Sequence, residues 1–262
     1  IPRTLAMSFY ADLDCSVIDE LPKGRLPIQT SVISNQRRAE VVAQLRRACQ
    51  AGRQAYWVCP LIEESEVLDC QAAEKTAQVF RQLLPELKIG LVHGRMKAEE
   101  KEQVMQAFKE QKLALLVATT VIEVGVDVPN ASLMIIENAE RLGLSQLHQL
   151  RGRVGRGSVE SHCLLLYQAP LSLLANKRLA AIRSTQDGFQ IAEQDLQLRG
   201  PGDVLGTRQT GDIIFKIAEL VRDKELLPTI AEAASSFLLN YPEQVDQLLS
   251  RWLAGRTQYS QV

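Results

Sequence analysis

The sequence has 262 residues, of which 46% are hydrophobic, so the chain is long and apolar enough to bury a sizeable core. Its formal net charge is −1, which excludes a broadly basic protein and confines any binding of nucleic acid to a local patch. The three histidines, His93, His148 and His162, are far apart and lack the spacing of metal ligands, so no metal site is predicted.

The cysteines and the N-terminal residues indicate the cellular compartment of the protein. The five cysteines are scattered and form no C-x-x-C pair, which is typical of reduced thiols, and we expect a cytoplasmic protein. No apolar run is long enough to span a bilayer and no signal peptide opens the sequence, so no membrane partner is expected. The segment Ile1–Leu5 lacks an initiator methionine, which indicates a piece of a longer protein.

Short apolar segments alternate with amphipathic segments as far as Tyr167. The predicted strands are Arg3–Phe9, Ile28–Ile33, Tyr56–Cys59, Ile89–Val92, Leu113–Ala118, Leu133–Ile136 and Cys163–Tyr167. The predicted helices are Gln36–Cys49, Ala72–Leu84, Ala98–Phe108 and one that begins with Ser145–Leu150. This alternation predicts βαβ units around a parallel sheet that is buried on both faces.

The pattern changes after Pro170. Helical spacing predicts a hairpin of two helices, Leu173–Arg183 and Ile191–Leu198, joined by a turn. The following segment, Arg199–Gly211, is rich in glycine and fits either a long surface connector or a functional loop. Residues 212–252 are predicted to be mostly helical and to serve as a packing element.

The segment Gln146–Gly157, called the arginine segment below, contains three arginines and three glycines directly after an apolar helix start. Arginine offers a permanent planar cation with five donors, and glycine lets the backbone approach a ligand closely. The segment therefore suits phosphate binding, although a basic surface loop has the same composition. From Arg141 to Gly211, nine Lys and Arg stand against five Asp and Glu, a net charge of +4 that leaves −5 for the rest. This asymmetry indicates an anionic partner near the middle of the chain.

A second polar group follows the predicted strand Leu113–Ala118. Thr119 and Thr120 come directly after it, and Gly125 and Asp127 come a few residues later. Because ligands bind beyond the carboxyl ends of parallel strands, we expect both the two threonines and the arginine segment at that edge of the sheet.

No G-x-x-x-x-G-K-[ST] motif occurs, so no P-loop is predicted to hold the phosphates of a nucleotide. The apolar run Leu133–Ile136 ends in Glu137, which is either a Mg²⁺-binding acid or a surface acid on a core strand. Phosphate-binding arginines without a P-loop are typical of one half of a two-domain ATPase, in which the other domain supplies the P-loop and the Mg²⁺ ligands.

These segments resemble helicase motifs. Leu116–Pro129 and Gln149–Arg156 are similar to motifs V and VI of superfamily 2 helicases, in that order and at that separation. Asp187–Gly211 resembles the translocation motif that the RecG and Mfd families share. Val58–Ser65 and Arg199–Gly202 resemble RecG proteins in particular. The whole chain is therefore similar to the C-terminal part of the RecG family of bacterial ATP-dependent DNA helicases.

The resemblance implies an α/β fold, with a RecA-like parallel sheet flanked by helices, followed by a helical hairpin with a Gly-rich loop and a helical C-terminal tail. The implied parts are 1–169, the second RecA-like helicase domain; 170–211, the translocation hairpin and loop; and 212–262, the helical C-terminal segment. The implied protein is a monomer.

The resemblance also implies an activity. The full-length protein would hydrolyse ATP and move double-stranded DNA, remodelling stalled replication forks and branched recombination intermediates. ATP with Mg²⁺ would be held mainly by a first RecA-like domain, and forked DNA would meet an N-terminal wedge. Neither is in this sequence, so the chain alone would be inactive. The alternatives are the equivalent part of the transcription-repair coupling factor Mfd, or a non-catalytic nucleic-acid-binding module, for which 5% aromatic residues offer few stacking platforms.

The resemblance assigns nucleotide-side roles to five residues. Arg153 and Arg156 would be arginine fingers on the γ-phosphate, and Gln149 would link the state of the nucleotide to domain closure. Gly125 and Asp127 would lie near the ribose or near the hydrogen bonds between the two domains.

The remaining implied roles concern DNA. Thr119 and Thr120 would bind a DNA phosphate through hydroxyl and backbone N–H groups, contacts that carry no sequence information. His93 and Gly94 would lie along the same strand of DNA, although a packed histidine at a strand end fits His93 nearly as well.

Three further residues would couple the nucleotide cleft to movement on duplex DNA: Arg178, Arg199 and Gln209. The two arginines would clamp the hairpin helices through a carboxylate, with Glu193 and Asp195 as candidates, or through main-chain carbonyls.

Overall fold

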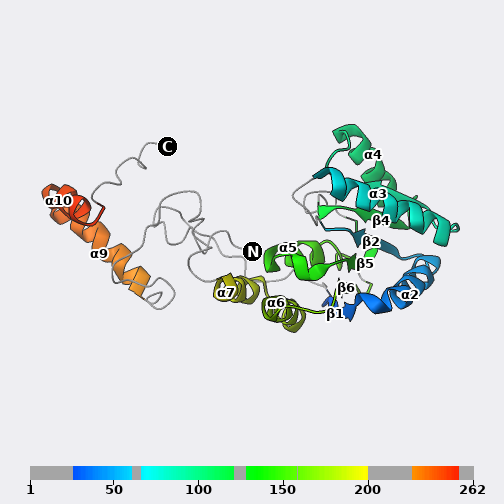
Figure 1. Cartoon of the computed structure of the whole chain (residues 1–262). Helices are drawn as coiled ribbons and strands as arrows, with labels where there is room; N and C mark the ends of the chain where they lie inside the picture. The colour runs from blue at the N-terminus through cyan, green and yellow to red at the C-terminus, as the bar shows by residue number, and fades with distance from the viewer. Residues whose placement is uncertain (1–25, 61–65, 121–127, 158, 200–225, 254–262) are drawn as a thin grey trace. The chain divides into compact units, whose positions relative to one another are not determined.

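The computed structural model of the chain describes residues 26–60, 66–120, 128–157, 159–199 and 226–253. These residues fall into two compact parts, one from 26 to 199 and the other from 226 to 253 (Figure 1). Each part is described by itself. The predicted strand Arg3–Phe9 and the Gly-rich loop after Arg199 lie outside the described residues.

Within the described residues of the first part, six parallel strands form one sheet. They are β1 (Gln29–Ser34), β2 (Gln54–Val58), β3 (Ile89–Val92), β4 (Leu115–Ala118), β5 (Ala131–Ile136) and β6 (His162–Tyr167). Their order across the sheet is β1-β6-β5-β2-β4-β3, and every pairing is parallel. The strands predicted from Ile28 to Tyr167 are therefore confirmed, with small shifts at their ends.

Helices flank the sheet (Figure 1). The first part contains α2 (Arg38–Gln50), α3 (Glu66–Leu83), α4 (Ala98–Lys109), α5 (Leu144–Arg151), α6 (Leu173–Ser184) and α7 (Gly188–Arg199), together with the 3₁₀ helices η1 (Asn35–Arg37) and η3 (Ala139–Arg141). The predicted helices and the predicted hairpin, α6 with α7, are confirmed. Ser172 begins the hairpin as an N-cap, since its side-chain oxygen accepts a hydrogen bond from the Ala175 N–H at 3.1 Å.

Both faces of the sheet are buried, as β2 illustrates. Ala55 and Trp57 belong to a core that α2 and α3 cover. Tyr56 and Val58 point to the other face, into a core that α4, α5 and the hairpin cover. All five residues of β2 are buried, which is the pattern of a central parallel strand. The RecA-like arrangement of a parallel sheet flanked by helices is thus confirmed.

The second part contains two helices, α9 (Leu227–Asn240) and α10 (Pro242–Leu253). Phe237 and Tyr241 stack near their junction, with ring centroids 5.6 Å apart. The prediction of a helical tail is confirmed for these residues. No helix among those described is long and apolar enough to cross a membrane.

Two glycines of the first part have a positive φ, Gly52 (86°) after α2 and Gly155 (75°) in the arginine segment. A Cβ at Gly52 would meet nothing within 4 Å, whereas a Cβ at Gly155 would lie 2.8 Å from Ile28 Cγ1. We expect Gly52→Ala to lower the free energy of unfolding by about 1–2 kcal/mol through backbone strain alone. Gly155→Ala should cost about 1–3 kcal/mol more, because Ile28 must shift. Urea unfolding of both variants measures the difference, and equal losses would contradict the close contact.

Candidate functional site

The carboxyl ends of β3 and β4 bring together the four residues predicted to bind DNA. His93 and Gly94 follow β3, and Thr119 and Thr120 follow its neighbour β4. The Thr119 N–H donates to the Val92 carbonyl at 3.2 Å, so the ladder of hydrogen bonds extends to the strand ends. Gly94 is exposed, Thr120 is half-buried and Thr119 is buried. The four residues thus share one edge of the sheet, called the carboxyl edge below.

His93 is enclosed at this edge. Its side chain is buried, and Nε2 lies 3.3 Å from Glu74 Oε1 on α3. Its Nδ1 is also buried and has no hydrogen-bond partner among the described residues. This geometry favours a histidine packed at a strand end over one that reaches out to DNA.

Two cations that the sequence analysis did not single out lie beside Gly94. Arg95 and Lys97 follow it in sequence, and both are exposed. Lys101, on the first turns of α4, donates from Nζ to the Gly94 carbonyl at 2.7 Å and fixes this loop. The available signal was the pair of cations directly after a predicted strand, at the edge where ligands bind. These cations give the carboxyl edge the positive charge that a phosphate backbone requires.

The arginine segment lies at the opposite edge, called the amino edge. A Cβ on Gly155 would touch Ile28, the residue before β1, and a Cβ on Gly157 would lie 2.5 Å from the Pro129 carbonyl oxygen, just before β5. The prediction that this segment shares the carboxyl edge with Thr119 and Thr120 was wrong. The reason is α5, whose 8 residues return the chain across the sheet before β6 begins.

The nucleotide-side residues of the arginine segment are accessible at the end of α5. Gln149 and Arg156 are exposed, and Arg153 is half-buried. The Arg156 Nε donates to the carbonyl of Gly152, the C-cap of α5, at 3.2 Å. Gly125 and Asp127 lie outside the described residues. The arrangement therefore offers cations at the amino edge, which suits binding of phosphate oxygens.

Arg151, the first arginine of the segment, behaves differently from the other two. It is 2% exposed, and its Nη1 donates to the carbonyls of Ile182 (2.6 Å) and Thr185 (2.9 Å), with Thr30 Oγ1 at 3.4 Å. Its Nη2 lies 3.0 Å from His148 Nδ1. Arg151 is thus fully engaged inside the protein and points away from solvent.

The resemblance assigned roles to Arg153 and Arg156 but none to Arg151, although a signal for the burial of Arg151 was present in the sequence. Leu147, Leu150 and Arg151 follow the i, i+3, i+4 spacing, so Arg151 lies on the apolar face of α5. Burial lowers the pKa of its guanidinium and raises the pKa of the neighbouring Cys163 thiol to about 12. Arginine remains charged even so, and its carbonyl partners compensate for the lost water.

The coupling residue that the structure describes is Arg178 on α6. Its Nη2 donates to the Glu140 carbonyl of η3 at 2.7 Å, a contact of the main-chain type, and its Nε is buried without a partner among the described residues. This bond ties α6 to the loop after β5. Arg199 ends α7, with its side chain outside the description, and Gln209 lies wholly outside it.

Glu137 directly follows β5 and forms an ion pair. Arg38 Nε lies 2.7 Å from its Oε1, and the same guanidinium stacks over Trp57 and Phe80, 5.1 and 5.3 Å from the ring centroids. The described residues contain no group of three or more His, Cys, Asp or Glu that could hold a metal ion. This geometry favours the interpretation of Glu137 as a structural acid.

The cysteines of the described residues are buried and reduced. Burial raises the pKa of Cys59 to about 12 and that of Cys49 to about 11. Only the thiolate is nucleophilic, so neither thiol serves as a nucleophile near neutral pH.

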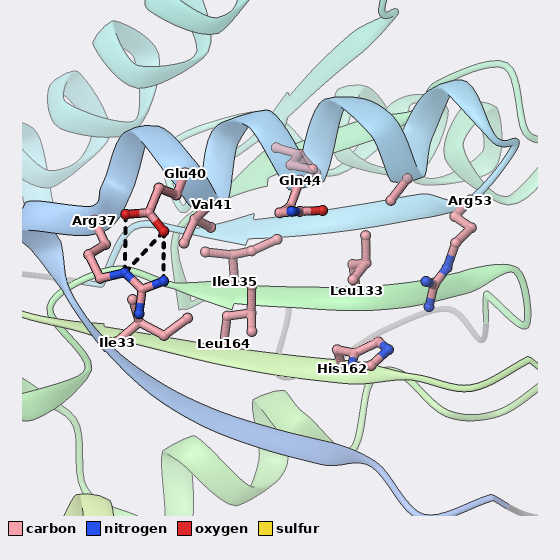
Figure 2. Close-up of a pocket in the computed structure, with 12 residues that line it drawn as sticks. Ile33, Arg37, Glu40, Val41, Gln44, Arg53, Leu133, Ile135, His162 and Leu164 are labelled. Carbon is pink, nitrogen blue, oxygen red and sulfur yellow. Dashed lines mark hydrogen bonds and ion pairs between the residues drawn. The ribbon is translucent and has the colours of Figure 1, made fainter.

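A groove of about 340 Å³ lies elsewhere, between α2 and strands β1, β5 and β6. Figure 2 shows apolar side chains along its floor, with Arg37 and Glu40 at one end and Arg53 at the other. Arg37 and Glu40 pair with each other at 2.6 Å. Arg53 donates to Ser132 Oγ (2.7 Å) and to the Glu160 carbonyl (2.5 Å). None of the predicted site residues lines this groove, so the candidate site lies at the two edges of the sheet instead.

Two family models match the chain. The helicase conserved C-terminal domain matches residues 37–158, and domain 3, C-terminal, of the ATP-dependent DNA helicase RecG matches residues 185–249. The first model covers strands β2 to β5 and the arginine segment, and the second covers the turn of the hairpin, α7, α9 and most of α10.

Curated proteins match along the whole chain. The ATP-dependent DNA helicase RecG of Pasteurella multocida is 62% identical over 263 residues, which cover 100% of this chain. The one of Escherichia coli K12 is 60% identical over 261 residues, or 99% of this chain. In both cases this chain spans 38% of the length of the relative.

A solved structure of RecG bound to a three-way DNA junction is similar as well. It is 46% identical to this chain, with a TM-score of 0.68, over 87% of this chain and 29% of that one. These matches favour RecG over the alternative of Mfd. The chain belongs to the RecG family of DNA helicases and matches the C-terminal part of its members.

Proposed function

We propose that the chain is the C-terminal motor half of an ATP-dependent helicase that translocates on double-stranded DNA and remodels stalled replication forks and branched recombination intermediates. The observation that carries the proposal is 60–62% identity to RecG helicases along essentially the whole chain. In this proposal, residues 1–169 are the second RecA-like domain, 170–211 the translocation hairpin and loop, and 212–262 a helical C-terminal segment. The protein acts as a monomer together with an upstream motor domain and wedge.

The amino edge of the sheet is the proposed nucleotide side. Arg153 and Arg156 reach the γ-phosphate of ATP, and Gln149 reports the state of the nucleotide to the rest of the domain. The exposure of Arg156 and Gln149 supports this assignment. Asp127 and Gly125 contribute to the same nucleotide side in this proposal, as the resemblance of their segment to motif V implies.

The residues present fit one side of a bound triphosphate. They supply cations for the phosphate oxygens but no P-loop, so ATP and Mg²⁺ are held mainly by the upstream motor domain. Arginine fingers neutralise the charge that develops on the transferred phosphoryl group. This chain thus contributes the positive charge and determines when that charge reaches the phosphates, while the upstream domain contributes the affinity for the nucleotide.

The carboxyl edge is the proposed DNA side. Thr119 and Thr120 bind phosphate oxygens through N–H and hydroxyl groups, next to Gly94, and His93 supports the loop from behind. We add Arg95 and Lys97 to this surface, since both are exposed beside Gly94. Branched DNA as the partner is supported by the related RecG structure, which is bound to a three-way junction.

The experiment that tests the proposal measures steady-state ATP hydrolysis with forked DNA. This chain is compared with a longer protein that includes the upstream motor domain. We expect hydrolysis, and remodelling of the fork, from the longer protein only, because the P-loop is upstream. Hydrolysis by this chain alone would mean that it contains a complete nucleotide site, and the proposal would fail.

The DNA surface gives a prediction of its own. In the longer protein, Arg95→Ala and Lys97→Ala should weaken binding of forked DNA regardless of its sequence. Each should reduce the slope of log K against log salt concentration by about 1, as expected for one lost phosphate contact. Fluorescence anisotropy at several salt concentrations measures the slope. Lys109→Ala is the control, because Lys109 is an exposed cation at the far end of α4. An unchanged slope in both variants would remove these residues from the surface.

A further inference from the structure

The ends of α5 and α6 are joined by a single side chain. Arg151 is the last residue of α5, while Ile182 and Thr185, whose carbonyls it binds, lie at the C-terminal end of α6. Carbonyls at a helix C-terminus lack partners within the helix, and a cation is favoured there. The two carbonyls therefore accept hydrogen bonds from Arg151, and these bonds connect α5 to the turn of the hairpin.

A second anchor fixes the same turn. The Ile28 N–H donates to Gln186 Oε1 at 3.0 Å, and Gln186 Nε2 donates back to the Ile28 carbonyl at 3.1 Å. Ile28 in turn packs so closely on Gly155 that a Cβ there would overlap it. The turn at Thr185–Asp187 thus contacts the arginine segment by two routes, one through Arg151 and one through Ile28.

His148 extends the link to α7. Arginine has only donors, so His148 Nδ1 accepts from Arg151, and the other ring nitrogen faces Gly188, the first residue of α7. A Cβ at Gly188 would lie 3.3 Å from His148 Nε2. Arg151 and His148 together therefore contact both helices of the hairpin at its turn.

Along α6 the contacts reach the other edge of the sheet. This helix has 12 residues, and its middle is bonded through Arg178 to the Glu140 carbonyl, in the loop that follows β5. The turn bound by Arg151 lies at the amino edge, beside Ile28, whereas Glu140 follows the carboxyl end of β5. These hydrogen bonds therefore connect α5 to α6 at the amino edge and α6 to the loop after the carboxyl end of β5.

We propose that Arg151 is a positioning residue that transmits movement of the finger-bearing segment to the translocation hairpin. This inference rests on the function proposed above. Arg151 contacts no nucleotide in this scheme. Arg151 ends α5 and lies two positions before Arg153, whose N–H donates to the carbonyl of Leu150 in the last turn of that helix. Any shift of the fingers when the nucleotide is hydrolysed therefore pulls on the carbonyls of Ile182 and Thr185. The hairpin then moves with the chemical step.

The test uses the longer protein with Arg151→Lys. Lysine keeps the charge and reaches one acceptor, but it cannot span the two carbonyls and His148 at once. We expect kcat and KM for DNA-dependent ATP hydrolysis to stay within about threefold of wild type, and the ATP consumed per remodelled fork to rise by about tenfold or more, within the range typical of coupling between sites. Arg183→Lys is the matched control, since Arg183 is an exposed arginine on α6, next to Ile182, whose carbonyl Arg151 binds.

Two results would overturn the inference. If hydrolysis and remodelling fall in parallel with thermal stability, Arg151 is only structural. If kcat collapses while ATP still binds, Arg151 is itself a finger. Should Arg151→Lys fail to fold, Gln186→Ala provides the test. It removes the hydrogen bonds between Gln186 and Ile28, and because Gln186 is exposed the fold should tolerate the change. We expect it too to raise the ATP consumed per remodelled fork. Failure of the wild-type protein to remodel forks with ATP would instead refute the proposed function itself.

Discussion

Replacing Arg153 or Arg156 with alanine in the longer protein should lower kcat for DNA-dependent ATP hydrolysis by about 10³–10⁵-fold, the typical contribution of an arginine finger. The affinity for ATP should change little, because in the proposed function the P-loop that holds the β- and γ-phosphates belongs to the upstream motor domain. The fingers act on charge that appears only in the transition state, so their removal lowers kcat and kcat/KM together. Steady-state kinetics and binding of a non-hydrolysable ATP analogue measure the two effects separately.

Matched variants separate the finger role from general basicity. Arg156→Lys keeps the charge but loses the planar fork, so it should recover only part of the lost rate. Arg47→Ala removes an exposed arginine from α2 and should leave hydrolysis unchanged. Normal turnover in both Arg153→Ala and Arg156→Ala would refute the finger assignment, whatever their effect on stability.

The sequence was sufficient for the elements but not for all of their ends. Strand β2 was predicted to begin at Tyr56, because Gln54 is polar and breaks the apolar run. In the structure Gln54 is buried, and its Nε2 donates to the carbonyls of Phe108 (2.6 Å) and Leu113 (2.7 Å). A polar residue that is satisfied by distant backbone groups cannot be distinguished from a loop residue by local pattern.

The location of the candidate site depended on topology. Thr119 and Thr120 were placed correctly at the carboxyl edge, because they directly follow a strand of a parallel sheet. The arginine segment was placed at the wrong edge, since the direction of α5 and the pairing of β1 with β6 are non-local features. The contact of Ile28 with Gly155 exists only after that pairing forms, whereas the burial of Arg151 was indicated locally by its place on the apolar face of α5.

Trp57→Ala should lower the free energy of unfolding by about 3–5 kcal/mol, the range for deleting a large buried aromatic side chain. Trp57 is completely buried in β2, and its ring meets Phe80 edge to face, with centroids 4.6 Å apart. The Arg38 guanidinium also lies over the Trp57 ring in a cation–π contact, and Arg38 forms an ion pair with Glu137. Urea unfolding followed by circular dichroism measures the loss. An unchanged m-value would show that stability, rather than the cooperativity of unfolding, has changed.

Trp57→Phe separates the contribution of the buried aromatic ring from that of the indole N–H. Its Nε1 is buried without a hydrogen-bond partner among the described residues, so phenylalanine removes no hydrogen bond and leaves only a smaller cavity. We expect a loss of about 1–2 kcal/mol, with the contact to Phe80 retained. A loss as large as that of alanine would mean that the indole N–H is bonded in solution. Because β2 lies between β4 and β5, the alanine variant should also weaken these two strands, which directly precede Thr119 and Glu137. The phenylalanine variant should preserve both.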